Sequence, residues 1–484
     1  MVGLDTAVTG RGRDLGRPGA LAVLATAQLV LALDYSIVNV ALPSIARSLG
    51  FGHGSVQWVI SAYALTFGGF LLLGGRAADR LGRRRMFVLA LAVFGTASLA
   101  GGFAGSPAVL VASRAVQGLG GAVLFPATLS LITTTFPEGR ERNRALAVWG
   151  SAGGSGLAVG VLAGGLLTSA FGWRSVLFVN VPIVALLLAL APVVLPRRVA
   201  RRGGGRYDVP GAVTATAGLV LVVFALVQGP VAGWTSPETL GAAAAGLVLL
   251  LAFVAIELRS PSPLMPLRLL RLRTMRGGVL VTAAFMASFG LQFFFLTLYL
   301  QQVRGQRPVI AGLAFVPLVA AIAVGANLGA RLATHAGVAR TLAGAMALGA
   351  TGLLLYTRLH PTGALAALVI AEIVAGLGHG ASFTNMFIAA GTGVAHSEQG
   401  IASGMASTAQ QVGGAMGLAL LVALLTARAD ALGLHGGLVT APPHVLDSAL
   451  HATFAAQAAI AMAGALVAAF VIGRPARASE PAGP

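Results

Sequence analysis

The sequence contains no cysteine and no lysine, and only 10% of its residues are charged. The lack of cysteine excludes disulfide bonds and cysteine-ligated metal sites. A typical soluble domain has about 25% charged residues. So few charges cannot cover a surface that faces water, so we interpret the chain as a membrane protein.

Apolar residues take the place of the missing charges: 57% of the 484 residues are hydrophobic, and the mean hydropathy is +0.87. Apolar runs of 18 or more residues predict membrane-spanning helices. The sequence predicts an all-α polytopic membrane protein with fourteen spans, at 18–42, 56–75, 86–105, 108–135, 144–170, 174–195, 209–229, 238–258, 276–300, 308–331, 340–357, 363–391, 401–427 and 449–473. We expect the first run to be an uncleaved span rather than a signal peptide.

The net charge is +18, and all the basic residues that contribute to it are arginines. A nucleic-acid binder would gather them on one polar face, whereas here they lie between the apolar runs. Segments rich in Lys and Arg are cytoplasmic. With the N-terminus inside, 25 arginines lie in inner segments and 6 in outer ones. We therefore predict a multi-pass protein of the cell membrane (inner or plasma membrane), in contact with lipid, with both termini cytoplasmic.

An internal repeat relates the two halves of the chain. The stretch GLGGAVLF at Gly118 recurs as GLGHGASF at Gly376, an offset of 258. Parallel halves of this kind are typical of one transporter architecture. We predict two parallel six-helix bundles, residues 1–196 and 275–484, joined by a two-helix insert with arginine-rich linkers at 197–274.

Four motifs follow one another in order: LDYSIVNVALP at 33–43, GRAADRLGRR at 75–84, RAVQGLGGA at 114–122 and WRSVLFVNVP at 173–182. Together they resemble the signatures of the major facilitator superfamily, in its fourteen-span drug:proton antiporter branch. The resemblance spans nearly the whole chain. It implies a bacterial, proton-coupled exporter of small amphipathic molecules that works by alternating access and confers multidrug or antibiotic resistance.

One motif departs from the family pattern. The fifth span has Gly160-Val161 where antiporters of this branch have Gly-Pro. The ladder of Gly156, Gly160 and Gly164, with Gly165 beside it, still allows close helix packing. The missing proline leaves open a second interpretation, a facilitator or proton-coupled transporter of a native metabolite.

The loop between the second and third spans is the candidate gating loop. Glycine permits tight turns and close backbone approach, and arginine attracts anionic lipid. The resemblance implies that Asp79 helps to latch the two halves on the cytoplasmic side, whereas the plainer alternative is an ordinary arginine-rich loop. In the second half Thr334 stands where Asp79 would, so no equivalent latch is expected there. The loop residues are Gly75, Asp79, Arg80, Gly82, Arg83 and Arg84.

Asp34 lies about 14 residues into the first span, or roughly 21 Å from the cytoplasmic face. A charge at that depth costs roughly 2.5–3.5 kcal/mol, so the chain keeps it for a partner or a task. The resemblance makes Asp34 a candidate protonation site and Arg114 its counter-ion. The alternatives are a structurally paired carboxylate and an arginine that snorkels outward.

The repeat offset adds a second carboxylate. It pairs Asp34 with Gln292 and Arg114 with Glu372, the other acid well inside a predicted span. We hypothesise that Asp34 and Glu372 are the two cavity carboxylates and that one or both exchange a proton for substrate. His379, two turns beyond Glu372, is either a proton relay or a hydrogen-bonded helix residue.

Polar residues inside other spans could line a substrate cavity. The candidates are Asn39, Gln57, Gln117, Gln292, His379 and Asn385. An aromatic cluster in the ninth span could also line an apolar pocket, or could simply pack or face lipid; it comprises Phe289, Phe293, Phe294, Phe295 and Tyr299.

No nucleotide-binding loop, metal cluster or nucleophile–base arrangement is visible in the sequence. We therefore expect no enzyme activity, metal, cofactor, ATP or nucleic-acid partner, with transport driven by the proton gradient. A non-transporting membrane sensor or scaffold remains an alternative, and it predicts that Asp34 and Glu372 are dispensable.

Overall fold

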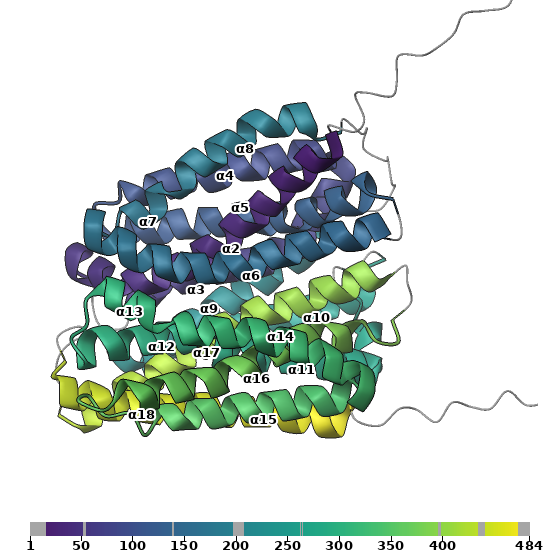
Figure 1. The fold of residues 1–484 in the computed structure, drawn as a ribbon. Helices are drawn as coiled ribbons and strands as arrows, with labels where there is room; N and C mark the ends of the chain where they lie inside the picture. The colour runs from purple at the N-terminus through teal and green to yellow at the C-terminus, as the bar shows by residue number, and fades with distance from the viewer. Residues whose placement is uncertain are drawn as a thin grey trace, which may run out of the picture. The chain divides into compact units, whose positions relative to one another are not determined.

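A computed structural model describes residues 16–51, 55–137, 140–196, 208–261, 263, 265–394, 398–433 and 441–472. Within these residues all regular structure is helical (Figure 1). The longer helices are α2 (Gly16–Leu49), α3 (Trp58–Leu81), α4 (Arg83–Gly102), α5 (Pro107–Thr135), α6 (Arg140–Phe171), α8 (Asn180–Val194), α9 (Val209–Ala232), α10 (Pro237–Arg259), α11 (Arg273–Ser288), α14 (Val316–Ala336), α15 (Val338–Tyr356), α16 (Leu365–Gly391), α17 (Gln399–Ala431) and α18 (Pro443–Val467).

Short helical segments complete the chain. They are η1 (Ser55–Gln57), α7 (Ser175–Phe178), η2 (Leu267–Arg271), η3 (Phe289–Leu291), α12 (Gln292–Leu298), η4 (Tyr299–Val303), α13 (Pro308–Ala314) and η7 (Ala468–Ile472).

Twelve helical segments of the described residues are long and apolar enough to cross a membrane. Two further apolar helical stretches, Ser55–Leu71 and Val159–Phe171, are shorter. They lie largely in α3 and α6. The C-terminal end of α3 carries Arg76 and Arg80, and the N-terminal end of α6 carries Arg140, Arg142 and Arg144. The predicted all-helical, multi-span class is confirmed, with twelve spans supported by length and composition.

Several helices begin where the sequence supplies a cap. Ser106 precedes α5 and Ser236 precedes α10, and each hydroxyl accepts a bond from the backbone N–H three residues on, at 3.4 Å and 3.3 Å. A proline follows each serine at the first helical position. A serine cap satisfies a free N–H of the first turn, and proline tolerates that position because it needs no donor.

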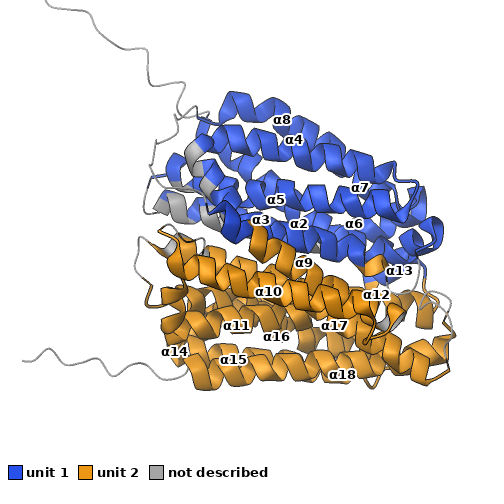
Figure 2. Cartoon of the chain, turned by 180° about the vertical axis from the view of Figure 1, so that it is seen from behind, with its two compact units in different colours: residues 1–51, 58–212, 307–313 blue, residues 52–57, 213–306, 314–484 orange. Residues whose placement is uncertain are grey.

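The chain forms two compact units (Figure 2). Unit 1 comprises residues 1–51, 58–212 and 307–313, and unit 2 comprises residues 52–57, 213–306 and 314–484. Unit 1 holds α2 to α8, and unit 2 holds α10 to α12 and α14 to α18.

The same helix order recurs in the two units at the predicted offset. α3 begins at Trp58 and α14 at Val316, while α5 begins at Pro107 and α16 at Leu365, so both pairs are 258 positions apart. A β-carbon on Gly118 would lie 2.4 Å from a backbone oxygen of α3, and one on Gly376 would lie 2.6 Å from a backbone oxygen of α14. The repeated glycine therefore brings the same two helices into close contact in each unit.

The first span differs between the units. α2 is one continuous helix of 34 residues, whereas its counterpart is divided into α11, η3, α12 and the π-helical η4. The division lies at Ser288, whose backbone leaves helical geometry with φ −108° and ψ −80°. Gln457 Nε2 of α18 donates to the carbonyl oxygen of Ser288 at 2.8 Å. A buried carbonyl near a helix break needs such a donor.

Candidate functional site

Asp34 lies in α2 and is completely buried in unit 1. Its Oδ2 accepts from Arg114 Nη1 at 2.6 Å. Its Oδ1 accepts from Gln117 Nε2 at 2.8 Å and from Asn180 Nδ2 at 2.7 Å. A buried charge is tolerated only when it is paired and hydrogen-bonded. Three donors from α5 and α8 meet that condition around one carboxyl group.

Arg114 is itself 2% exposed. Its Nε donates to the carbonyl oxygen of Val59 at 3.0 Å, and its Nη1 also donates to Gln117 Oε1 at 2.7 Å. The guanidinium carbon lies 4.4 Å from the ring centroid of Tyr63, an arrangement that gives cation–π attraction. Arg114 therefore points inward to Asp34, and the alternative of a snorkelling arginine does not hold.

A second layer of bonds fixes Asn180, which begins α8. Its Nδ2 lies 3.1 Å from Ser98 Oγ of α4, and that hydroxyl donates to the carbonyl oxygen of Leu177 at 2.9 Å. Both residues are completely buried. From the sequence we predicted a role for neither residue. An amide inside an apolar helix was the available signal for Asn180, whereas nothing in the sequence distinguishes Ser98.

Gln292 and His379 contact each other in unit 2. Gln292 Nε2 and His379 Nδ1 are 3.2 Å apart. Because an amide nitrogen only donates, Nδ1 is assigned as the acceptor and the ring proton is placed on Nε2. The His379 ring lies 4.9 Å from the ring of Phe285 and 5.7 Å from that of Phe289. This geometry makes His379 a hydrogen-bonded residue in an aromatic environment.

Glu372 is also completely buried, and neither carboxyl oxygen has a hydrogen-bond partner among the described residues. The repeat offset therefore brings no counterpart of the Asp34–Arg114 pair, because Gln292 bonds His379 instead. A carboxyl group without a partner in an apolar interior needs a proton or a cation to balance its charge. Glu372 is chemically suited to bind either one.

Two of the other polar candidates bond within their own helices. Asn39 Nδ2 donates to Tyr35 O, and Asn385 Nδ2 donates to Ala381 O, both at 2.8 Å and both within their own helix. Gln57 is 2% exposed in η1. Gln117 is the predicted cavity residue that donates to Asp34 among the hydrogen bonds within unit 1 of the described chain.

The candidate gating loop is a tight turn between α3 and α4. Gly82 has φ +100°, a conformation that glycine adopts readily, and a β-carbon on Gly75 would touch Pro126 at 3.5 Å. Arg83 begins α4. Arg84 donates to Pro192 O at 2.7 Å and to Leu195 O at 3.1 Å, at the C-terminal end of α8.

A cation is favourable at a helix C-terminus, so Arg84 stabilises α8. The side chains of Asp79 and Arg80 lie outside the described part of the structure. The turn recurs in unit 2 at Gly337, which has φ +82°. There Thr334 Oγ1 donates to Arg331 O within its own helix at 2.6 Å.

The glycine ladder of α6 lies against α2. A β-carbon on Gly156, Gly160 or Gly164 would come within 2.6 to 2.7 Å of a backbone oxygen of α2. A β-carbon on Gly165 would come equally close to Pro308 O of α13, at 2.6 Å. Val161, which replaces the family's proline, is completely buried. These glycines bring α6 into backbone contact with the helix that carries Asp34.

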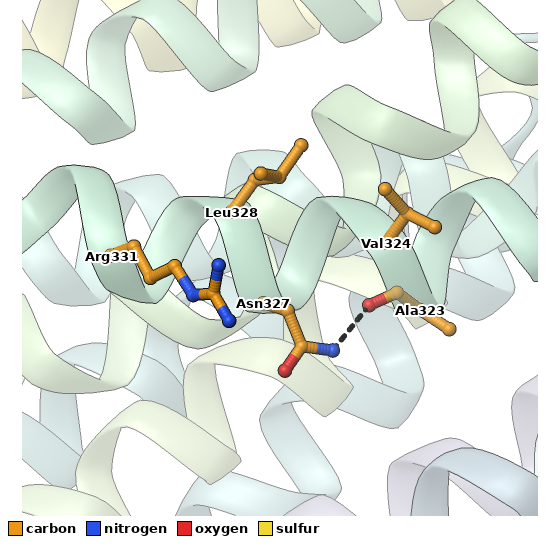
Figure 3. Close-up of a pocket in the computed structure, with 5 residues that line it drawn as sticks. All are labelled: Ala323, Val324, Asn327, Leu328 and Arg331. Carbon is orange, nitrogen blue, oxygen red and sulfur yellow. Dashed lines mark hydrogen bonds between the residues drawn. The ribbon is translucent and has the colours of Figure 1, made fainter.

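A shallow pocket of about 300 Å³ opens on α14 in unit 2 (Figure 3). Its lining residues are Ala323, Val324, Asn327, Leu328 and Arg331. Asn327 Nδ2 bonds the carbonyl oxygen of Ala323 in its own helix at 2.8 Å. None of the predicted site residues lines this pocket. Across the described ranges no group of three or more His, Cys, Asp or Glu side chains could hold a metal ion.

Comparison with known proteins decides the family. The sequence pattern that defines the Major Facilitator Superfamily matches residues 24–418. The chain belongs to the major facilitator superfamily. The resemblance of its four motifs is thus confirmed, and this superfamily member is a transporter rather than an enzyme.

Relatives within the superfamily include resistance and export proteins. The puromycin resistance protein pur8 of Streptomyces alboniger is 43% identical over 449 residues, which cover 91% of this chain and 88% of the relative. The cephamycin export protein CmcT of Amycolatopsis lactamdurans is 42% identical over 408 residues, which cover 83% and 84%. These relatives are consistent with the drug:proton antiporter branch.

The superfamily fold is also found among solved structures. The POT family transporter PepTSo has a TM-score of 0.69, with 94% of this chain and 97% of that chain covered at 15% identity. At that identity the likeness shows the fold and nothing further.

Proposed function

We propose that this chain is a proton-coupled exporter of amphipathic small molecules, antibiotics among them, in the bacterial cell membrane. The similarity to puromycin resistance and cephamycin export proteins across more than four fifths of the chain supports the substrate class. The similarity to a cephamycin export protein supports the direction of transport. The proton gradient drives the cycle, with no other cofactor.

The observation that carries the proposal is the Asp34 cluster, which comprises Asp34 and its three donors Arg114, Gln117 and Asn180. As a carboxylate, Asp34 binds α2 to Arg114 on α5 at 2.6 Å and to Asn180 on α8 at 2.7 Å. Bonds to a charged acceptor are roughly twice as strong as neutral ones. A proton that arrives from outside and neutralises Asp34 weakens these bonds and favours another arrangement of the helices. Alternating access then follows as a shift between two states that differ in proton affinity.

Glu372 is the second carboxylate of this proposal. Its unpartnered oxygens leave it free to take a proton or the cationic group of a substrate. Asp79 latches the cytoplasmic side, and the ladder of Gly156, Gly160 and Gly164 lets α6 pack on α2. These roles rest on the motifs and on the close approaches described above.

The topology belongs to the same proposal. Fourteen spans follow if the shorter apolar stretches Ser55–Leu71 and Val159–Phe171 cross the membrane together with the twelve longer ones. The arginine distribution supports cytoplasmic termini. The bundles are then residues 1–196 and 275–484, with the insert at 197–274.

Ethidium uptake into inverted membrane vesicles tests the function. We expect uptake that requires an imposed pH gradient, that stops when the gradient is collapsed, and that is lost in Asp34→Asn. Asp208→Asn is the matched control, because Asp208 is also buried but accepts from Gly211 N at 2.8 Å at the start of α9. An asparagine there still caps the helix.

Three results would count against the proposal. Uptake by the wild type that ignores the gradient would make the chain a facilitator. Gradient-driven uptake that persists in Asp34→Asn would move the coupling to Glu372. Equal loss in Asp34→Asn and Asp208→Asn would show damage that is not specific to the cluster.

A further inference from the structure

Asn180 is a buried residue that enters the proposed function only through the bond it donates to the Asp34 carboxylate. Its Nδ2 donates to Asp34 Oδ1 at 2.7 Å, and Ser98 Oγ lies 3.1 Å from the same nitrogen. Its other polar atom, Oδ1, has no hydrogen-bond partner although the side chain is completely buried. An unpaired acceptor beside a carboxyl group is costly unless another state of the site uses it.

We propose that Asn180 is a positioning residue that serves both protonation states of Asp34. It donates through Nδ2 to the carboxylate. When Asp34 takes a proton, the amide turns over and Oδ1 accepts the new O–H. The inference rests on the proposed function, since it requires Asp34 to take up and release a proton.

The other donors to Asp34 either have no acceptor atom or have it already in a hydrogen bond. Arg114, from α5, has only donors. Gln117 already uses its Oε1 to accept from Arg114 Nη1 at 2.7 Å. Tyr63, from α3, faces the guanidinium of Arg114 at 4.4 Å. Asn180 alone among the three donors to Asp34 has a free acceptor.

Ser98 allows the amide to turn. With Asp34 as a carboxylate, the Ser98 hydroxyl donates to Leu177 O at 2.9 Å and accepts from Asn180 Nδ2 at 3.1 Å. A hydroxyl has one donor and two acceptor positions, so it can face either end of an amide. The Ser98 hydroxyl can therefore contact Asn180 before and after the rotation.

The two bonds differ in strength, which sets the direction of the expected effect. A hydrogen bond to a charged acceptor is roughly twice as strong as one between neutral groups. Loss of the Asn180 side chain thus destabilises the ionised form of Asp34 more than its protonated form. We expect the midpoint of Asp34 protonation to move to higher pH by roughly one pH unit.

Infrared difference spectroscopy of the purified full chain in lipid nanodiscs measures this midpoint without any substrate. The carboxyl band that Asp34→Asn removes reports Asp34. We expect Asn180→Leu to move the midpoint of that band upward by about one pH unit and Ser98→Ala to move it less in the same direction. Asn327→Leu is the control for the same exchange elsewhere, because Asn327 is exposed on α14 of unit 2 and its Nδ2 donates to Ala323 O of its own helix.

Each outcome is decisive. A midpoint that stays at the wild-type value in Asn180→Leu and Ser98→Ala overturns the role of Asn180 and leaves the proposed function standing. If Asn180→Leu fails to give a monodisperse protein, the shift in Ser98→Ala decides alone, because that variant removes no contact to Asp34. If Asp34→Asn removes no titrating band, Asp34 exchanges no proton, and both the inference and the proposed coupling fall.

Discussion

At the scale of single residues, the two units balance their buried carboxyl groups differently. Asp34 meets three donors, whereas Glu372 has none among the described residues. A carboxylate with hydrogen-bond donors from several helices holds those helices together. A buried carboxylate without donors needs a proton or a cation to balance its charge. Asp34 and Glu372 are thus two of the buried acids of the described residues, and mutation can separate their chemistry.

Replacement of Glu372 by glutamine tests the second acid. Glutamine keeps the shape but can neither lose a proton nor pair with a cation, so we expect at least a tenfold loss of gradient-driven ethidium uptake, about 1.4 kcal/mol. Initial rates in inverted vesicles across a pH series measure it. Glu257→Gln is the control, because Glu257 Oε2 accepts from Met265 N at 2.9 Å and the amide oxygen can still accept. Normal rates with an unchanged pH dependence in Glu372→Gln would rule out a role for Glu372.

The sequence predicted part of this chemistry. Resemblance to the family placed Arg114 with Asp34, and the structure has the two in contact at 2.6 Å. Asn180 was not predicted, because it lies 146 positions from Asp34 and only the folded chain joins them. The repeat offset located Gln292 and Glu372 but did not show that Gln292 contacts His379 and that the Glu372 oxygens have no partner among the described residues. An offset fixes positions along helices and not which side chains meet.

At the scale of helices, close packing depends on glycine. α6 contacts α2 through positions where any side chain would overlap the backbone of its neighbour. The sequence indicated this ladder because glycines four residues apart lie on one helix face. It did not indicate the division of the first span in unit 2, since residues 273–303 contain no proline and the break is satisfied by Gln457, 169 positions from Ser288.

Substitution within the ladder tests the helix contact. A β-carbon on Gly160 would lie 2.0 Å from Ser36 Oγ and 2.6 Å from Leu33 O, so we expect Gly160→Leu to destabilise unit 1 by about 1–3 kcal/mol or more. Thermal unfolding followed by size-exclusion chromatography measures the change. Gly150→Leu in the same helix meets nothing within 4 Å and should leave the unfolding temperature unchanged. Equal unfolding temperatures for both variants would contradict close packing at Gly160.

At the scale of the whole molecule, the absence of cysteine makes the topology directly measurable. Single cysteines introduced into this chain can be labelled without background. Fourteen spans with cytoplasmic termini predict that a membrane-impermeant maleimide reaches Gly105→Cys and Thr235→Cys from outside intact cells. Pro137→Cys should react only after the membrane is opened.

The three cysteine positions distinguish a wrong orientation from a wrong number of spans. Labelling of Pro137→Cys but not of Gly105→Cys in intact cells would show that the orientation in the membrane is opposite to the predicted one. Protection of Thr235→Cys alone would show that α9 and α10 do not cross the membrane as a pair. Composition alone predicted a helical membrane protein, because apolar runs this long are compatible with few other structures. A count of fourteen needs, besides the twelve longer spans, the shorter apolar stretches Ser55–Leu71 and Val159–Phe171 of α3 and α6 to cross the membrane.

The matched glycines of the two units also bear on how such a chain can change over time. Gly118 and Gly376 both lie where a β-carbon would strike the neighbouring backbone. A mutation there disturbs the scaffold itself, whereas the polar centres beside them already differ: Asp34 with Arg114 in one unit, Gln292 with His379 in the other. Two copies of one helix set can thus acquire separate chemistry without repacking. New substrates are then reached by exchanging interior polar residues, while the architecture is inherited intact.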